Sequence, residues 1–277
     1  MLPQFYVDDI IKTALAEDIN YIDTTTDLMI PSDARTTARF IAKADGILCG
    51  LDVALRVFRL LDDTLSVTVH IPEGQPVKKG DLIVEFEGYT RALLKGERTA
   101  LNLLQHMSGI ATATHQAAEL VKGTRAAVTD TRKTLPGMRP LQKYAVTVGG
   151  GKNHRYNLSD GAMLKDNHID AAGGIPQAVS QIRQKLGHMV KLEVETRNLD
   201  EVKQALDAGA DVIMLDNMSC DEMAKAVALV DGRALLEASG GITADRIRAV
   251  AETGVDIISI GALTHSVTAM DISMRIG

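Results

Sequence analysis

The chain has 277 residues, a formal net charge of −6, and 45% hydrophobic and 24% charged residues, a composition typical of a globular protein. The acidity argues against a nucleic-acid-binding protein, which needs a broad basic surface, and no apolar run reaches the roughly 18–20 residues that span a bilayer. Two distant cysteines, Cys49 and Cys220, argue against a disulfide framework or a thiolate metal site, and no secretory signal opens the chain, so we expect a cytoplasmic protein.

The first hundred residues combine strand and helix signals. The segment TTARFIAKADGILCGLDVALRVFRLL (36–61) predicts a strand, a turn and a helix. Apolar and polar residues alternate between glycines over 66–90, which predicts antiparallel hairpins, and a long helix follows from about Thr90. We therefore expect an α+β sandwich domain over residues 1–108, with the C-terminal segment 266–277 packing back on it.

The second half alternates short apolar runs with amphipathic segments. Asn198, Ser219 and Thr243 precede three of these segments, at positions where helix N-cap residues belong. Strands that alternate with helices and read as unbroken apolar runs are typical of a parallel sheet buried on both faces. The fold class expected for this half is therefore α/β.

The spacing of the strand ends favours a barrel. They fall near Glu195, Asp216, Ser239 and Gly261, at steps of 21, 23 and 22 residues, which is the pitch of compact βα units. We expect an α/β barrel over residues 109–265, with the active site on the rim formed by the carboxyl ends of the strands. A doubly wound open sheet is the alternative.

A cluster of cations interrupts this acidic chain. Residues 130–165 hold seven Lys/Arg and two Asp, a local balance of 7 − 2 = +5. Arg132 and Lys133 follow one strand directly, Lys165 ends another apolar run, and GGGKNHR places glycines 149–151 before further cations. Glycines let backbone N–H groups approach an anion closely, so we expect a small, highly anionic ligand. A mobile loop with solvated charges is the alternative.

Carboxylates are expected beside these cations. Glu195 and Asp216 end consecutive strands, and two carboxylates near several cations suit a hydrated Mg2+ carried by a phosphorylated substrate. Salt bridges with the lysines of the cluster are the alternative. Glu193 and Glu237 are weaker candidates of the same kind.

Two glycine turns follow the last two strands. Ser239, Gly240 and Gly241 precede a predicted helix, and Gly261 stands in the equivalent place after the final strand. In barrel enzymes, phosphate groups often bind at such helix N-termini, to backbone N–H groups that no side chain covers. The alternative for each of the two turns is a glycine turn that binds no ligand.

Arg98 is unusual in the first half. In ALLKGERTALNLLQHM it shares a predicted helix face with Leu94 and Leu101, so the guanidinium emerges from an apolar stripe. Either the side chain snorkels to solvent, or the helix presents it to an anion across a domain or subunit boundary.

A series of motifs resembles the quinolinate phosphoribosyltransferase family over about residues 36–270. In chain order they are GERTALNLLQHMSGIAT, DTRKTLPGMR, GGGKNHRYNLSDGAMLKDNHI, LEVET, IMLDN, EASGGI and SIGALTHS. The second and third motifs are the most specific. In EDINYIDTTT, Ile22 stands where the family often has glycine, a departure that touches none of the expected chemistry.

The resemblance implies an open-faced sandwich domain, an incomplete barrel of seven strands, and a homodimer or higher assembly in which Arg98 reaches the partner's active site. It implies transfer of phosphoribosyl from phosphoribosyl pyrophosphate to quinolinate with decarboxylation, which gives nicotinate mononucleotide, CO2 and pyrophosphate for NAD synthesis. It also implies Mg2+ with the cosubstrate, no organic cofactor, and no nucleic-acid or membrane partner.

The resemblance also implies roles for individual residues. The implied ligands of quinolinate are Arg98, Arg132, His154, Arg155 and Lys165, with Thr131 as a further substrate-binding residue. Lys133, Glu195 and Asp216 would engage phosphoribosyl pyrophosphate, the two acids through Mg2+ directly or through water. Lys133, Lys165, Glu195 and Asp216 would be catalytic, and Ser239, Gly240, Gly241, Gly261 and Ala262 would bind the 5′-phosphate.

Three other functions stay open on the residues alone. A related pyrophosphorylase could use another heterocyclic acceptor on the same scaffold. A barrel aldolase or lyase could use Lys165 as a Schiff-base nucleophile. A swinging-arm carrier could present Lys78 or Lys79 at a hairpin turn.

Overall fold

The computed structural model describes residues 2–277, which form two compact units. The first unit consists of the residues up to His115 together with Thr134–Gly150 and Leu263–Gly277, and the second consists of Gln116–Lys133 and Gly151–Ala262. The ranges of the two units alternate along the sequence, so the chain crosses from one unit to the other several times. No helix within residues 2–277 is long and apolar enough to cross a membrane.

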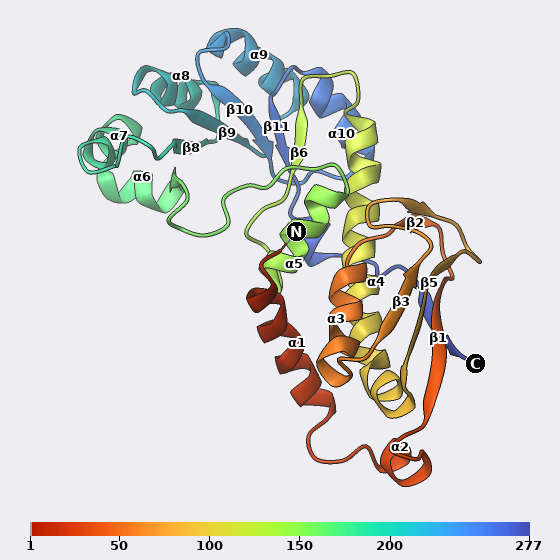
Figure 1. The fold of residues 1–277 in the computed structure, drawn as a ribbon. Coiled ribbons are helices and arrows are strands. Elements are labelled where there is room, and N and C mark those ends of the chain that lie inside the picture. Colours follow the sequence, from red (N-terminus) through yellow and green to blue (C-terminus); the bar gives the residue numbers. More distant parts are fainter. Residues whose placement is uncertain (1) are drawn as a thin grey trace. The chain divides into compact units, whose positions relative to one another are not determined.

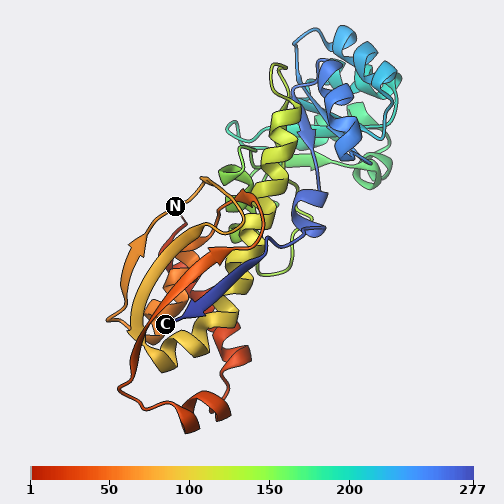
Figure 2. The same cartoon turned by 90° about the vertical axis from the view of Figure 1, so that its right-hand side faces the viewer.

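The first unit contains an antiparallel sheet of four strands in the order β12-β1-β5-β3 (Figure 2). Their bounds are β1 (Arg35–Ala42), β3 (Ser66–Val69), β5 (Leu82–Tyr89) and β12 (Ile272–Ile276), beside a small pair formed by β2 (Gly46–Ile47) and β4 (Pro76–Val77). The antiparallel pairing expected within 66–90 is confirmed, because β3 pairs with β5. The last strand, β12, pairs with β1, so that Ile276 lies opposite Ala38.

Helices cover one face of this sheet and supply its core. They are α1 (Gln4–Asp18), α3 (Leu51–Leu61) and the first part of α4 (Thr90–Leu120) (Figures 1 and 2). Phe40 of β1 and Phe86 of β5 point to the same face, and Phe58 of α3 packs on Phe86 with ring centroids 4.9 Å apart. The unit also contains α2 (Thr24–Met29) and α5 (Arg139–Val148). Ile22 is exposed in the segment between α1 and α2, away from this core.

The second unit is built on a parallel sheet of six strands in the order β6-β11-β10-β9-β8-β7. Their bounds are β6 (Ala127–Thr129), β7 (Ala162–Leu164), β8 (Leu192–Thr196), β9 (Val212–Asp216), β10 (Leu235–Ser239) and β11 (Ile257–Ser259). This confirms the α/β fold class. The seventh strand that the resemblance implied is reduced to a single parallel bridge between Lys152 and Thr129, because the segment after Lys152 leaves the ladder.

Helices alternate with these strands, as the sequence predicts (Figure 1). They are α6 (Asp166–Ala172), α7 (Ile175–Arg183), α8 (Leu199–Asp207), α9 (Cys220–Val230) and α10 (Ala244–Glu252), and the short α11 (Ala262–His265) follows β11. The Asn198 side chain accepts from the N–H of Glu201 and begins α8, while Ser219 and Glu222 form a capping box that begins α9. Apart from α7, which follows α6, each of these helices begins just after a strand ends, which leaves polar side chains at one edge of the sheet.

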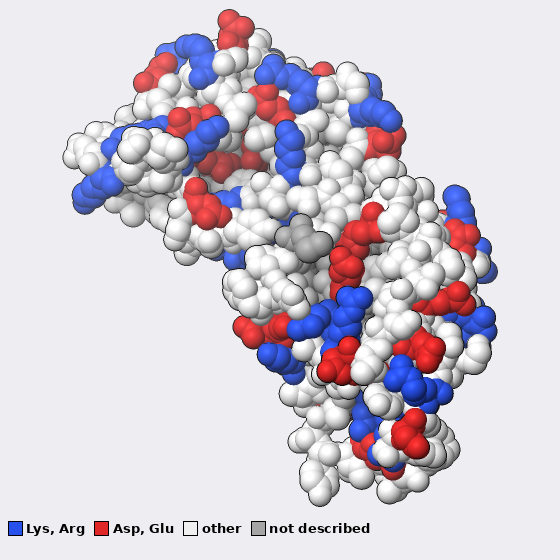
Figure 3. Space-filling model, viewed as in Figure 1, with Lys and Arg blue, Asp and Glu red and all other residues white. Residues whose placement is uncertain are grey.

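The surface carries charges of both signs. On the face shown in Figure 3, Lys and Arg side chains lie among Asp and Glu, with no broad area of one sign. Such a face offers no extended basic track of the kind that binds nucleic-acid backbones.

Candidate active site

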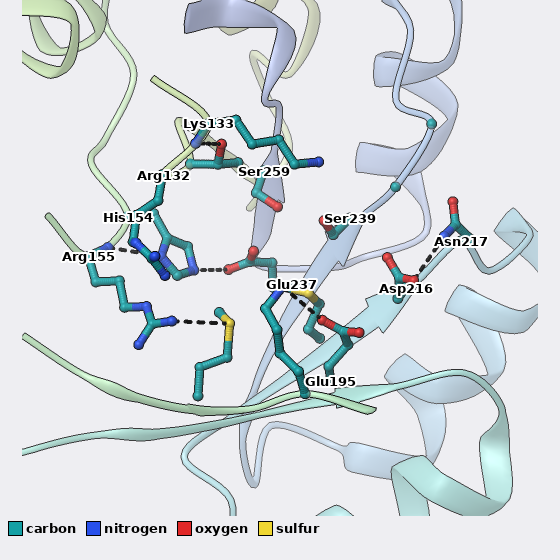
Figure 4. A pocket seen from close by; sticks show the side chains of 16 residues that line it. Arg132, Lys133, His154, Arg155, Glu195, Asp216, Asn217, Glu237, Ser239 and Ser259 are labelled. Carbon is teal, nitrogen blue, oxygen red and sulfur yellow. Dashed lines mark hydrogen bonds and ion pairs between the residues drawn. The ribbon is translucent and has the colours of Figure 1, made fainter. Parts of the chain in front are cut away.

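A cavity of about 520 Å³ opens in the second unit, at the edge of the sheet where the parallel strands end. Its walls combine cations, acids and small residues (Figure 4). The lining residues are Thr131, Arg132, Lys133, His154, Arg155, Met163, Lys165, Glu195, Met214, Asp216, Asn217, Glu237, Ser239, Gly240, Gly241 and Ser259. A cavity of this size accommodates a ligand as large as a nucleotide.

Most residues proposed from the sequence line this one cavity, although they come from segments far apart in the chain. Three lie elsewhere. Arg98 is an exposed residue of α4 in the first unit, while Gly261 and Ala262 follow β11 without lining the cavity. The sequence reasoning did not single out Met163, Met214, Asn217 or Ser259. Met163 and Met214 could have been found, because both belong to apolar runs that end at the predicted rim.

A buried aspartate fixes the segment that carries His154 and Arg155. Asp130 follows β6 and is fully buried, and its carboxylate accepts from the Asn153 side-chain amide at 2.6 Å and from the His154 N–H at 2.9 Å. These bonds tie the irregular segment after Lys152 to the end of β6. They therefore bring the cations of two separate motifs to the same side of the cavity (Figure 4).

The glycine run 149–151 serves packing instead of forming a wall of the cavity. A Cβ atom on Gly149 would lie 2.4 Å from the carbonyl oxygen of Ala111, so this position needs a residue without a side chain. Gly150 has φ of +94°, a conformation that favours glycine, just after α5 ends. None of the three glycines is among the described residues that line the cavity. The expectation that they approach a bound anion stays a prediction, and the packing of Gly149 is an independent reason for a glycine there.

His154 lies at the base of the cavity between two buried acids. Its Nε2 atom is 3.2 Å from a carboxylate oxygen of Glu193 and 3.3 Å from one of Glu237. Its Nδ1 atom accepts a hydrogen bond of 2.9 Å from the Arg155 N–H, which assigns a proton to Nε2. Both ring nitrogens are therefore engaged within the protein, and the imidazole is held in one orientation.

The three side chains retain a proton. Burial opposes a charged imidazolium, but the hydrogen bonds and charges of Glu193 and Glu237 outweigh it and raise the pKa of His154 to about 10. Burial also raises the pKa of Glu193, aided by repulsion from Glu237 and against the hydrogen bond from His154. The pKa of about 10 therefore belongs to His154, Glu193 and Glu237 together. Because the Arg155 N–H faces Nδ1, the three groups share this proton on the side of Nε2 and the carboxylates.

The same three residues have a spacing that could hold a metal ion, since one ligand atom of each lies within 4.8 Å of the others. A metal ion on Nε2 would require a proton on Nδ1. That proton would face the Arg155 N–H at 2.9 Å, donor against donor. We therefore interpret His154, Glu193 and Glu237 as a proton-sharing cluster.

The proton-sharing cluster should make stability depend on pH. An unfolded histidine titrates near about 6.5, whereas the folded value is about 10, so this contribution is full below about pH 6.5 and is lost as the pH rises through about 10. We expect the melting temperature to fall between pH 7 and 10 more steeply in the parent protein than in Glu237→Gln, which has one buried charge fewer. Equal slopes in thermal unfolding scans would contradict the assignment.

Arg155 is held from two sides. Its Nη1 donates to the carbonyl oxygen of Gly161 at 2.8 Å, and its Nη2 lies 3.7 Å from the Met163 sulfur. Burial and the nearby charge of Arg132 lower the pKa of Arg155, which nevertheless stays a cation because a guanidinium titrates far above neutral pH. Two neighbouring guanidinium groups of this kind attract a ligand with more than one negative charge.

The opposite side of the cavity carries acids and a glycine turn (Figure 4). Glu195 lies 3.4 Å from the Lys165 ammonium group, and Asp216 accepts from the Asn217 side-chain amide at 2.8 Å. Gly240 and Gly241 have φ of +87° and +57°, and the turn that they form exposes backbone amides between β10 and α10. The donor set of carboxylate oxygens suits Mg2+, which prefers hard oxygen ligands and keeps several waters.

Family models match nearly the whole chain. The model described as "Quinolinate phosphoribosyl transferase, N-terminal domain" matches residues 23–108, and that described as "Quinolinate phosphoribosyl transferase, C-terminal domain" matches residues 110–275. A relative from Bacillus subtilis, described as a probable nicotinate-nucleotide pyrophosphorylase (carboxylating), is 44% identical over 94% of this chain and 90% of its own length. The tobacco (Nicotiana tabacum) mitochondrial quinolinate phosphoribosyltransferase (decarboxylating) 2b is 40% identical over 99% and 83%.

Solved structures agree with these matches. The crystal structure of NadC from Streptococcus pyogenes superposes with a TM-score of 0.97 at 41% identity, over 100% of this chain and 98% of the other. The nicotinate-nucleotide pyrophosphorylase of Francisella tularensis superposes with a TM-score of 0.95 at 42% identity, again over 100% and 98%.

Proposed function

The chain belongs to the quinolinate phosphoribosyltransferase family, and we propose that the cavity of its second unit is the site where it performs the reaction of that family. The enzyme is a pentosyltransferase of NAD biosynthesis, which transfers phosphoribosyl to quinolinate with loss of CO2. The observation that carries the assignment of the site is the meeting of Arg132, Arg155 and Lys165 with Glu195 and Asp216 in one cavity.

The charges of the cavity match the two substrates. Quinolinate carries two carboxylates on a pyridine ring, and phosphoribosyl pyrophosphate carries a monophosphate and a pyrophosphate. We assign quinolinate to the side of Arg132, Arg155 and Lys165, with His154 held beneath by its acids. We assign the 5′-phosphate to the turn of Gly240 and Gly241, whose backbone N–H groups could donate to it.

The reaction needs no protein nucleophile. The pyridine nitrogen attacks C1 of the ribose as pyrophosphate leaves, through a transition state with oxocarbenium character. The positive charge then on the ring nitrogen stabilises the electron pair left on the adjacent carbon when the carboxylate departs as CO2, and a proton replaces it. Catalysis therefore rests on positioning the two substrates and on a preorganised electrostatic field.

Mg2+ would enter with the cosubstrate and neutralise charge on its leaving pyrophosphate. Glu195 and Asp216 would hold it, directly or through water, and Lys133 would contact the same phosphates. The positions of both acids at the ends of the neighbouring strands β8 and β9 support this assignment.

Asp216→Asn should raise the Mg2+ requirement. The substitution keeps the shape of the side chain and its contact with Asn217 but removes one negative charge from the acidic side. We expect the Mg2+ concentration for half-maximal rate to rise about tenfold, because one charged ligand contributes on the order of 1.4 kcal/mol or more. Steady-state rates over a Mg2+ series check this, and an unchanged requirement would place the ion elsewhere.

Arg98 is assigned to a second subunit in this proposal. The residue is exposed on the first unit and does not line the cavity. We propose a homodimer in which Arg98 completes the quinolinate site of the partner. Mixing the two impaired single variants Arg98→Ala and Arg132→Ala should recover part of the activity, because some mixed dimers then contain one intact site.

The assay that tests the function is direct. Purified protein is incubated with phosphoribosyl pyrophosphate, Mg2+ and quinolinate, and release of CO2 and pyrophosphate is measured. Nicotinate in place of quinolinate is the control acceptor. Absence of quinolinate-dependent turnover would refute the assignment.

The other functions considered from the residues have less support. Lys165 pairs with Glu195 at 3.4 Å, so the nitrogen that a Schiff-base enzyme would use as a nucleophile is engaged in an ion pair. Lys78 pairs with Asp45 at 3.0 Å, and the N–H of Lys79 donates to the same carboxylate. The turn that would carry the modified lysine of a swinging-arm protein is therefore held by bonds to Asp45.

A further inference from the structure

Asn217 adopts a backbone conformation that few residues other than glycine adopt. Its φ is 55°, and Asp231 is the one other non-glycine residue with positive φ among residues 2–277. This left-handed region is unfavourable for an ordinary L-residue, and asparagine tolerates it better than most. The Asn217 N–H donates to the carbonyl oxygen of Ser239 at 2.9 Å, so the conformation is fixed by a bond to the neighbouring strand.

The side chain of Asn217 touches both polar features on this side of the cavity. Its Nδ2 atom donates to the Asp216 carboxylate at 2.8 Å (Figure 4). The same amide group packs closely against Gly240. A Cβ atom added to Gly240 would lie 2.3 Å from Oδ1 and 2.6 Å from Cγ of Asn217. One amide group thus contacts the proposed acid and the proposed phosphate turn at the same time.

We propose that Asn217 is a positioning residue that locks the Asp216 carboxylate to the turn of Gly240 and Gly241. The two features would then bind opposite ends of one cosubstrate, the Mg2+-pyrophosphate end and the 5′-phosphate end. The spacing between these two anion sites is therefore set by an amide that need not touch the substrate. The inference rests on the proposed function, because that function assigns the two ends of phosphoribosyl pyrophosphate to these features.

If Asn217 served only the structure of its turn, a different property of the residue would matter. It requires a left-handed residue at position 217, and glycine satisfies that requirement without strain. A link between Asp216 and Gly240 requires the amide itself. Asn217→Gly therefore separates the two roles, since it keeps the backbone conformation and removes the side chain.

The first test measures KM for each substrate in the full-length enzyme. We expect Asn217→Gly to raise KM for phosphoribosyl pyrophosphate about tenfold, because the hydrogen bond from the side-chain amide to the Asp216 carboxylate is lost. KM for quinolinate should stay within about twofold. Asn217→Asp should be worse, since it places a second carboxylate against Asp216. Asp231→Gly is the matched control, because it changes the other left-handed residue, after α9 and outside the cavity lining, and should leave both KM values unchanged.

The second test is a double-mutant cycle. Gly240→Ala introduces a Cβ atom that collides with the Asn217 side chain and also strains φ at +87°. In the Asn217→Gly background the collision disappears and the strain remains. The rise in KM for phosphoribosyl pyrophosphate caused by Gly240→Ala should therefore be several-fold smaller in that background than in the parent.

The outcomes separate this inference from the proposed function. If the parent lacks quinolinate-dependent turnover, the function fails, and calorimetric binding of phosphoribosyl pyrophosphate with Mg2+ to the same variants still tests Asn217. Equal rises in both KM values, or a loss of affinity that only parallels a loss of thermal stability, would overturn the positioning role. So would a double-mutant cycle in which the two effects simply multiply.

Discussion

Replacing Arg132 with alanine is expected to lower kcat/KM for quinolinate by roughly 10- to 200-fold without unfolding the protein. A hydrogen bond between charged groups contributes roughly 1.5–3 kcal/mol, and each 1.4 kcal/mol is about a factor of ten in rate. Arg132 lines the cavity beside Arg155, so the lost cation is one that the anionic substrate would contact. Steady-state kinetics with quinolinate varied at saturating phosphoribosyl pyrophosphate measure the effect.

Two further variants make the Arg132 result specific. Arg132→Lys keeps the positive charge but cannot bind a carboxylate in the bidentate manner of a guanidinium, so it should recover only part of the activity. Arg197→Ala removes an arginine that pairs with Glu201 outside the cavity, and should leave kcat/KM unchanged. Turnover near that of the parent in Arg132→Ala would count against quinolinate binding at this side of the cavity.

Gly149→Ala is expected to destabilise the fold by about 3 kcal/mol, which corresponds to a fall in melting temperature of about 6–12 °C. The added Cβ atom would lie 2.4 Å from the Ala111 carbonyl oxygen and 2.7 Å from the Thr114 Cβ atom. Both atoms belong to α4 and cannot move without distorting a long helix. Differential scanning calorimetry of the parent and the variant provides the comparison.

The control for Gly149 is Gly187→Ala. No atom lies within 4 Å of the Cβ position at Gly187 among the described residues, so this variant should melt within about 2 °C of the parent. If the glycine run served anion binding, Gly149→Ala would instead retain its melting temperature and lose affinity for substrate. The two interpretations therefore give opposite pairs of results.

Periodicity and spacing anticipated the architecture because each is a local property of the sequence. The apolar runs and the N-caps at Asn198 and Ser219 predicted β8, β9, α8 and α9, and the step of 21 residues from Glu195 to Asp216 placed both acids at the same edge. The seventh strand was the exception. It survives as one bridge because the Asn153 side chain and the His154 backbone N–H donate to Asp130 in place of a neighbouring strand.

Contacts between distant segments could not be read from the sequence. The glycine run before Lys152 looked like an anion-binding loop, yet Gly149 is required by the close approach of α4, which begins almost sixty residues earlier. The position of His154 between Glu193 and Glu237 likewise depends on three segments that are far apart in the sequence. Asn217 is the last residue of the motif IMLDN but carries no charge, and its contact with Gly240 appears only in three dimensions.

The pairing of β12 with β1 constrains when this protein can fold during its synthesis. The ribosome makes β1 (Arg35–Ala42) early, but its partner Ile272–Ile276 emerges more than two hundred residues later. At about 5–20 residues per second, β1 waits at least about 10 s with one edge unpaired. The strands and helices of the second unit, by contrast, emerge within that interval and can assemble first. Nascent chains are therefore expected to present the open edge of β1 to chaperones until β12 has been synthesised.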